Sequence, residues 1–214
     1  VLAQSECKSS ASHRRNFFVY GAKNLNKLAD IAIFPFLASN LNCNGCDLVS
    51  SNIKPYIINE ISGVRIGILG IVDSDLNSKV LQKNINGISI DSEYDTINKW
   101  SSILKDSTDV LIILTSSGIP WDREIVYNNF LNNLDNGLDP SKTSLNAIEM
   151  GYFCNDVDLI ISGGVSKGYD IPWYDKSSGV YTVQNYGNGT SFGHLKLVIH
   201  KPSNYFTGYE LLVD

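Results

Sequence analysis

Hydrophobic positions recur at helical spacing in three segments of this chain, which predict three helices. From 24 to 32, apolar residues fall at intervals of three and four and form one face of a helix. A second stripe runs from 91 to 105, and Ser92 followed by Asp95 at its start resembles a capping box. A third helix is expected around 145–154, after a polar stretch. Each of these helices has one apolar face to bury against another element.

Runs of β-branched and other apolar residues predict strands between and after these helices. The pair Ser62-Gly63 separates two of the runs, and two such residues are typical of a tight hairpin turn. The run at 109–114 is apolar almost throughout, as expected for a strand that is covered on both faces of its sheet. Helices and strands are mixed at first and strands then follow alone, which indicates an α/β sandwich with a mixed sheet. The predicted strands are 34–40, 56–61, 64–72, 109–114, 157–161, 180–184, 194–199 and 209–213.

The composition narrows the class of protein and its partners. The 214 residues are 43% hydrophobic and 18% charged, which is typical of a globular chain. With 17 Lys and Arg against 22 Asp and Glu, the formal net charge is −5, so no nucleic-acid or anionic-membrane partner is expected. No apolar stretch is long enough for a membrane span. We expect a polar arm at residues 1–16 and a single domain over residues 17–214.

The four cysteines are candidates for disulfides. Cys43 and Cys46 have the C-x-x-C spacing, which suits a redox motif, half of a zinc site or a tight disulfide. A zinc site usually needs a second pair, whereas Cys7 and Cys154 stand alone. A redox pair normally opens a helix after a strand, and here Asn and Gly surround the pair in a loop. One or two structural disulfides, or free thiols, are therefore expected rather than a metal site.

Three features favour export from the cytoplasm. The cysteine count is even, and Asn188 begins an Asn-Gly-Thr glycosylation sequon. The chain starts at Val1 rather than at methionine, and its first residues resemble the remainder of a signal-peptide cleavage site. A secreted, extracellular or periplasmic location is therefore expected.

Six segments together carry the motifs of one known family, in its order and spacing. They are 34–40 (F-P-F-L-A-S-N), 54–70 (K-P-Y, then G-V-R-I-G-I-L-G), 109–115 (D-V-L-I-I-L-T), 157–164 (V-D-L-I-I-S-G-G), 184–187 (Q-N-Y-G) and 193–197 (G-H-L-K-L). In these segments the chain resembles the 5′-nucleotidases, which are calcineurin-like metallophosphoesterases. The matches extend from about residue 20 to residue 213, so the resemblance covers the whole predicted domain.

The resemblance implies where metal ligands would stand, and other residues occupy those positions. Enzymes of this family hold two divalent metals about 3.5–4 Å apart, which clamp a phosphate and generate a hydroxide nucleophile. Ser116 replaces the histidine that follows L-T, while Val165 and Lys167 replace the two histidines of G-G-H-S-H. Asn16 stands where the G-N-H-E loop has its histidine, and the D-x-H and G-D strands would lie before Val1. Serine and valine are poor ligands, and a lysine places a cation where the metal belongs.

The other candidate groups do not restore a metal site. His194 and His200 lie in one predicted strand and His13 lies in the polar arm, so we interpret them as structural or solvated residues. Asp73 and Asp75 follow a predicted strand and suit either a ligand site at the sheet edge or a turn with a helix cap. A cluster of aromatic residues suits either the anchoring of loops or the binding of a sugar or a partner: Tyr169, Trp173, Tyr174 and Tyr181.

These observations predict an incomplete metallophosphoesterase-like α/β sandwich with mixed sheets. We expect it to be catalytically inactive, to need no cofactor, and to act in binding, scaffolding or assembly. The alternative is a metal-dependent nucleotidase whose two divalent metals are held by a separate N-terminal fragment. Without the first strands of the family, the strand at 109–114 or at 157–161 is expected to have an open edge. Another protein chain, or an N-terminal fragment cleaved from the same precursor, is therefore expected to complete the sheet.

Overall fold

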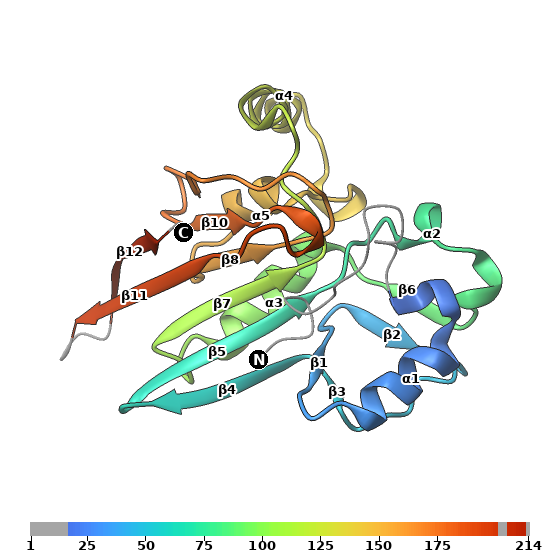
Figure 1. Cartoon of the computed structure of the whole chain (residues 1–214). Helices are drawn as coiled ribbons and strands as arrows, with labels where there is room; N and C mark the ends of the chain where they lie inside the picture. Colours follow the sequence, from blue (N-terminus) through green and yellow to red (C-terminus); the bar gives the residue numbers. More distant parts are fainter. Residues whose placement is uncertain (1–16, 201–204, 213–214) are drawn as a thin grey trace.

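The centre of the molecule is a six-stranded mixed sheet, seen in a computed structural model that describes residues 17–200 and 205–212 (Figure 1). In spatial order its strands are β4 (Tyr56–Ile61), β5 (Val64–Ile71), β7 (Val110–Thr115), β8 (Leu159–Ser162), β10 (Tyr181–Gln184) and β9 (Trp173–Tyr174). The four inner strands run parallel, and β4 and β9 join them antiparallel at the two edges. This arrangement confirms the α/β class and the mixed sheet.

The expected open edge at 109–114 or 157–161 is wrong. The first of these runs forms β7, which pairs with β5 on one side and with β8 on the other. The second run forms β8, which pairs in turn with β10. Both are interior strands, and all six residues of β7 are buried because apolar layers cover both faces of the sheet. The edges are instead β4, whose last four residues are exposed, and the two-residue β9.

Helices cover one face of the sheet and bury the larger core. The predicted second and third helices are α3 (Glu93–Leu104) and α5 (Ala147–Tyr152). The Ser92 hydroxyl caps α3 by accepting a hydrogen bond from the Asp95 N–H at 3.1 Å, as the sequence indicated. Their apolar faces pack against alternate residues of the strands, and the buried set includes Leu69, Ile71, Ile97, Leu104, Leu111, Ile113, Ile148, Met150 and Ile160.

A further helix, α4 (Arg123–Asp135), was not predicted from the sequence. Its apolar residues are interrupted by four asparagines, which weaken the stripe that identifies an amphipathic helix. Asp122 precedes it without a side-chain hydrogen bond to the first turn, so the usual start signal is also weak. Tertiary packing stabilises α4, because Phe130 is buried against α5 through edge-to-face contacts with Tyr152 and Phe153.

The opposite face of the sheet carries a second apolar cluster, part of which a hairpin covers (Figure 1). The hairpin consists of β11 (His194–His200) and β12 (Tyr205–Leu212). Alternate residues of β11, among them Leu195 and Leu197, pack on the cluster. Within the described residues, cover is thinner over β4 and β5, where Ile66 and Ile68 are half-buried and Ile61 is 59% exposed.

The N-terminal part of the described chain forms a smaller layer beside the sheet. The first predicted helix is α1 (Ala22–Ile31), which packs with Phe36 and Leu76 into a separate core. The predicted strand at 34–40 contributes only the two-residue β1. The short elements of this layer are the 3-10 turns Phe17–Tyr20 and Gln82–Asn84, β1 (Phe36–Leu37), β2 (Leu41–Cys43), β3 (Ile53–Lys54), α2 (Leu76–Lys79) and β6 (Ile88–Ile90). Two more 3-10 turns, Pro140–Lys142 and Gly187–Gly189, lie in the later loops.

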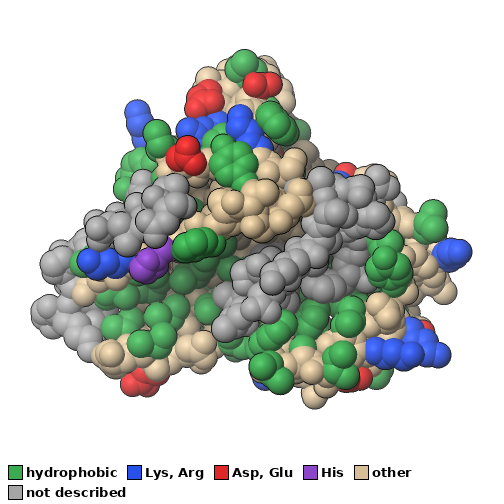
Figure 2. Space-filling view, in the orientation of Figure 1, with side chains coloured by type: hydrophobic (Ala, Val, Ile, Leu, Met, Phe, Trp, Pro, Cys, Tyr) green, Lys and Arg blue, Asp and Glu red, His purple; other side chains and the backbone are tan. Residues whose placement is uncertain are grey.

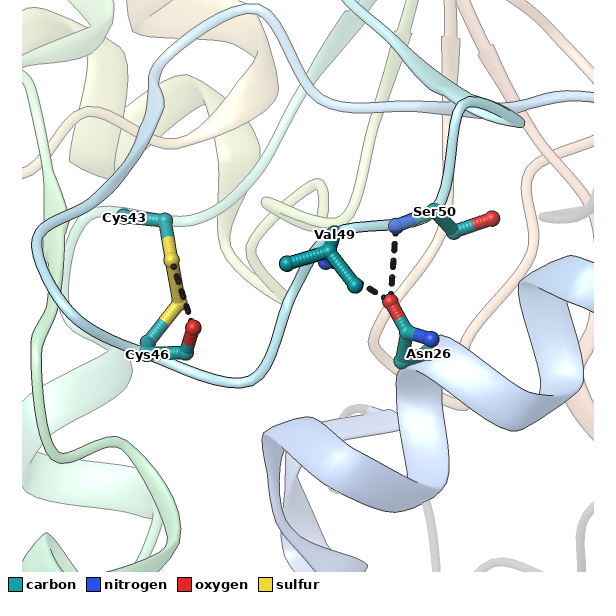
Figure 3. The surroundings of a disulfide bond; sticks show 5 residues. All are labelled: Asn26, Cys43, Cys46, Val49 and Ser50. Atoms are coloured by element: carbon teal, nitrogen blue, oxygen red, sulfur yellow. Dashed lines mark hydrogen bonds between the residues drawn. A yellow bond between two sulfur atoms is a disulfide. The ribbon is translucent and has the colours of Figure 1, made fainter.

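Cys43 and Cys46 form a disulfide at the end of β2 (Figure 3). The loop that follows is held against α1, because the Asn26 side-chain oxygen accepts hydrogen bonds from the N–H groups of Val49 and Ser50 at 2.8 and 2.7 Å. Cys154 is a free and fully buried thiol, and burial raises its pKa. Cys7 lies outside the described residues.

Over the described ranges, no helix combines the length and the apolar character that a membrane span requires.

Candidate functional site

Ser116, Val165 and Lys167, at the expected metal-ligand positions, lie at the end of the central sheet where its parallel strands finish. We call this end the sheet edge; it is distinct from the edge strands β4 and β9. Since β5, β7, β8 and β10 are parallel, the loops that follow them meet where the strands end. Ser116 follows β7, whereas Val165 and Lys167 follow β8. Asp73, the first acidic residue after β5, lies at the same edge. Asn16 lies outside the described residues.

Ser116 is engaged with the backbone on both sides. Its hydroxyl oxygen accepts a hydrogen bond from the Asp73 N–H at 3.0 Å, which links the loops after β5 and β7. The loop after β8 presses on the Ser116 carbonyl through Gly164, where φ is +92°. A methyl group at Gly164 would overlap the Ser116 carbonyl oxygen, so glycine is required there by both space and backbone conformation. Ser116 therefore acts as a joint between three loops.

Val165 and Lys167 turn to different neighbours. The Val165 isopropyl group packs on Gly118, where any side chain would overlap it. The Lys167 ammonium donates a hydrogen bond to the Trp121 carbonyl at 3.3 Å and lies over the rings of Trp121 and Tyr169. Val165 thus makes an apolar contact between loops, and Lys167 brings a positive charge to the sheet edge.

These side chains do not fit a pair of divalent metals. A valine has no donor atom, a protonated lysine repels a cation, and a serine hydroxyl is a weak ligand for the metals that imidazole binds. In the parts of the chain that the structure describes, no three His, Cys, Asp or Glu side chains are grouped to hold a metal ion. We therefore derive no catalytic step through a metal from this chain's residues.

Gln184, at the end of β10, forms hydrogen bonds to the loop after β7, to the end of β8 and to the loop after β8. Its side-chain oxygen accepts hydrogen bonds from the Ile119 N–H and the Ser162 hydroxyl, both at 2.8 Å. Its side-chain amide donates to the Lys167 carbonyl. Gln184 is only 3% exposed, so its hydrogen bonds are shielded from water and expensive to leave unmade. The sequence placed this residue in the Q-N-Y-G match, and nothing local indicated that it would join segments up to 65 positions away.

A buried carboxylate, Glu93, joins the loop after β5 to the segment before α5. It accepts hydrogen bonds from the Ser74 N–H and hydroxyl at 2.6 and 2.8 Å and from the Leu145 N–H at 3.4 Å. Burial raises the pKa of Glu93, and the hydrogen bonds oppose that shift. Asp73 forms an ion pair with Lys79 and accepts the Asp75 N–H at 2.9 Å. The pair of aspartates therefore forms a turn before α2, as one of the two interpretations predicted, but Asp75 at the N-cap makes no side-chain hydrogen bond to the helix.

The remaining predicted site residues lie away from this edge or at the surface. Asn188 is exposed in the turn Gly187–Gly189 with φ at +68°, where a sequon asparagine is accessible. His194 is exposed at the start of β11, and His200 ends that strand. Of the aromatic cluster, Tyr174 packs against Tyr181 on the sheet, with ring centroids 4.7 Å apart and ring planes tilted by 37°.

The fold is similar to those of solved 5′-nucleotidases and phosphoesterases. A Staphylococcus aureus protein described as a 5′-nucleotidase superimposes on 92% of this chain with a TM-score of 0.68 and 17% sequence identity, although it is matched over only 36% of its own length. The calcineurin-like phosphoesterase YfkN of Bacillus subtilis gives a TM-score of 0.66 at 18% identity, covering 91% of this chain and 60% of that protein. No family model matches the chain.

One curated protein is also similar in sequence. The cell wall protein Lmo0130 of Listeria monocytogenes is 27% identical in an alignment 180 residues long, which covers 79% of this chain and 21% of that protein. The chain thus spans about a fifth of its curated relative and about a third of the S. aureus structure. The fold is that of the 5′-nucleotidases and calcineurin-like phosphoesterases, and the expected resemblance is confirmed at the level of structure.

Proposed function

We propose that this domain keeps the 5′-nucleotidase fold without its catalysis and serves in binding, scaffolding or assembly. One observation carries the proposal: Ser116, Val165 and Lys167 stand at the expected ligand positions and each makes a structural contact of its own. A catalytic phosphoesterase site needs anionic or neutral donors that converge on the metals. Here the same loops present the isopropyl group of Val165, the hydrogen-bonded hydroxyl of Ser116 and the ammonium of Lys167.

The way in which the loops are joined supports this proposal. In a two-metal enzyme the metals themselves bind several loops together, since each ion takes ligands from more than one segment. In this chain Gln184 bridges the segments after β7 and β8, and the close approach of Gly164 to Ser116 joins them again. The sheet edge is therefore held in shape by side chains and backbone, as a domain without resident metals would require.

We also propose that a further chain segment packs on the thinly covered sheet face. Ile66 and Ile68 of β5 are half-buried, and Ile61 of β4 is 59% exposed on that same face. An exposed apolar surface of this kind favours association. The segment would be another protein chain or an N-terminal fragment of the same precursor. Light scattering on the protein as isolated tests this, and a monomer of 23.6 kDa that stays soluble would contradict it.

An extracellular location is part of the proposal. The disulfide between Cys43 and Cys46 and the exposed sequon at Asn188 suit an oxidising compartment. The similar Listeria protein is described as a cell wall protein, which agrees with this location.

The proposal of lost catalysis is tested by metal analysis and phosphatase assays on the isolated protein. We expect no stoichiometric zinc, manganese or other transition metal, and no release of phosphate from nucleoside monophosphates in the presence of added metal. A Ser116→Ala variant serves as the control, because trace activity from a contaminant would be unchanged by it. Stoichiometric metal together with turnover that depends on residue 116 would overturn the proposal, and the same result obtained only with a co-purified N-terminal fragment would establish the alternative nucleotidase.

A further inference from the structure

At the same sheet edge, five side chains form a row in which aromatic rings and cations alternate. The order is Trp121, Lys167, Tyr169, Arg123 and Trp173. The Lys167 ammonium lies 5.0 Å from the Trp121 ring centre and 4.9 Å from that of Tyr169. The Arg123 guanidinium lies 4.6 Å from the Tyr169 ring centre and 5.7 Å from that of Trp173. These four cation–π contacts join the loops after β7 and β8 to α4 and β9.

Hydrogen bonds to backbone carbonyls position Lys167, Tyr169 and Arg123 in the row. The Trp121 carbonyl accepts a hydrogen bond from the Lys167 ammonium at 3.3 Å, and the Tyr169 hydroxyl donates its proton to the Pro120 carbonyl. The Arg123 guanidinium donates to the Ile171 carbonyl at 2.9 Å. Because these side chains are already ordered, a ligand that binds to the row loses little free energy in fixing them.

The inner end of the row is packed, whereas its outer end is open to solvent. Trp173 contacts Tyr127 of α4 edge-to-face, with ring centres 5.0 Å apart, and belongs to the helix-side core. Trp121 is 64% exposed, and Ile171 and Tyr186 beside the row are 70% and 45% exposed. Large apolar side chains that are both exposed and held in place mark binding surfaces more often than chance exposure does.

The charges around the row indicate what kind of ligand it fits. Arg123 and Lys167 bring two positive charges, and Asp122, Glu124 and Asp170 in the same segments bring three negative ones. Figure 2 shows basic, acidic and hydrophobic side chains interspersed on the face below α4. This balance does not favour an anionic polymer, whose binding needs a clear excess of cations. Lysine and acidic residues are depleted at the cores of protein interfaces, whereas tryptophan, tyrosine and arginine are enriched there, so the binding test must separate a protein partner from a carbohydrate.

We propose that the outer end of this row binds a neutral carbohydrate. The weakly positive C–H groups on one face of a sugar ring are attracted to the electron-rich face of the Trp121 indole. The sugar hydroxyls can donate to the neighbouring carboxylates and accept from the Lys167 ammonium, which has more N–H groups than its one hydrogen bond uses. The surface thus offers an apolar platform with polar groups of both signs around it. This proposal does not depend on the loss of catalysis.

Isothermal titration calorimetry with two neutral oligosaccharides, cellohexaose and N-acetylchitohexaose, tests the proposal on the full chain. We expect saturable binding of at least one of them in the millimolar range or tighter. Trp121→Ala is expected to weaken it by about tenfold or more, and Trp121→Phe, which keeps an aromatic face, by less. Leu81→Ala removes a side chain of similar exposure, 65%, from another part of the surface and is expected to change nothing.

Thermal melting of each variant controls for folding, because Trp121 is mostly exposed and its replacement should leave the stability nearly unchanged. The proposal would be overturned if neither oligosaccharide gave saturable binding, or if Trp121→Ala bound as tightly as the unaltered chain. It would also be overturned if only an anionic polymer such as polygalacturonate, or only a protein partner, bound at this surface. Its failure would leave the metal analysis unaffected, so the two proposals can fail separately.

Discussion

Gln184 offers the sharpest test of how the sheet edge is held together. Replacing it with leucine keeps a similar volume at the end of β10 and removes every polar atom of the side chain. The Ile119 N–H and the Lys167 carbonyl would then lose the hydrogen bonds that Gln184 provides. The Ser162 hydroxyl has one proton, which it could donate instead to the Ser117 carbonyl oxygen 2.9 Å away. The perturbation therefore leaves two backbone groups without the hydrogen bonds that Gln184 supplied.

The expected loss follows from the cost of those two groups. A buried donor or acceptor without a partner costs about 1–3 kcal/mol, and the part-buried Lys167 carbonyl should cost about 1 kcal/mol, so Gln184→Leu should lower the free energy of unfolding by about 2–4 kcal/mol. For a chain of this size, each kcal/mol lowers the melting temperature by about 2–4 °C, so we expect a decrease on the order of 10 °C. Denaturant unfolding and calorimetry measure both quantities, and amide exchange at Ile119 should become faster.

A matched control lies two residues away on the same strand. Thr182 is fully buried like Gln184, but its hydroxyl has no hydrogen-bond partner among the described residues. Thr182→Val removes that hydroxyl at constant shape and should leave the stability unchanged or slightly higher. If Gln184→Leu stayed within about 1 kcal/mol of the unaltered chain, or if Thr182→Val lost as much, the hydrogen bonds would not be what joins the loops.

Three more changes probe separate features. Burial raises the pKa of Glu93, so the folded state binds this proton more tightly than the unfolded state does. The free energy of unfolding therefore falls as pH rises above about 4.5. In denaturant unfolding across pH, Glu93→Gln should remove that part of the pH slope, and an unchanged slope would contradict it. Gly164→Ala should destabilise by about 2 kcal/mol more than Gly137→Ala, because both glycines have positive φ but only the first has a carbonyl oxygen where the methyl would go; equal losses in calorimetry would refute the steric argument. Replacing Cys43 and Cys46 with serine should lower the free energy of unfolding by only about 2 kcal/mol, since the disulfide closes a very short loop, and a larger loss would indicate a wider role.

Local pattern was enough to predict most of the secondary structure. The hairpin of β4 and β5 falls within one residue of its expected bounds, because its alternating apolar residues and its Ser62-Gly63 turn are both encoded locally. The helix α3 was predicted for the same reason, from its stripe and its cap. In contrast, α4 was missed, since its asparagines hide the stripe and its stability comes from packing on α5.

The candidate site divides in the same way. The identities of Ser116, Val165 and Lys167 are written in the sequence, and the resemblance to one family is the basis for expecting ligand positions there. What these side chains do instead could not be predicted, because it depends on neighbours in other loops. Lys167, for example, donates a hydrogen bond to the carbonyl of Trp121, which lies 46 positions earlier in the sequence.

The sequence by itself determined the class of fold, the main helices and strands, and the residue types at the expected ligand positions. Only the tertiary structure decided that β7 and β8 are interior strands, that Gln184 joins the loops, and that aromatic rings and cations alternate beside α4. The physical reason is the range of the interactions. Periodicity and turn chemistry act between residues a few positions apart, whereas strand order and side-chain contacts between loops are set by burial across the whole chain.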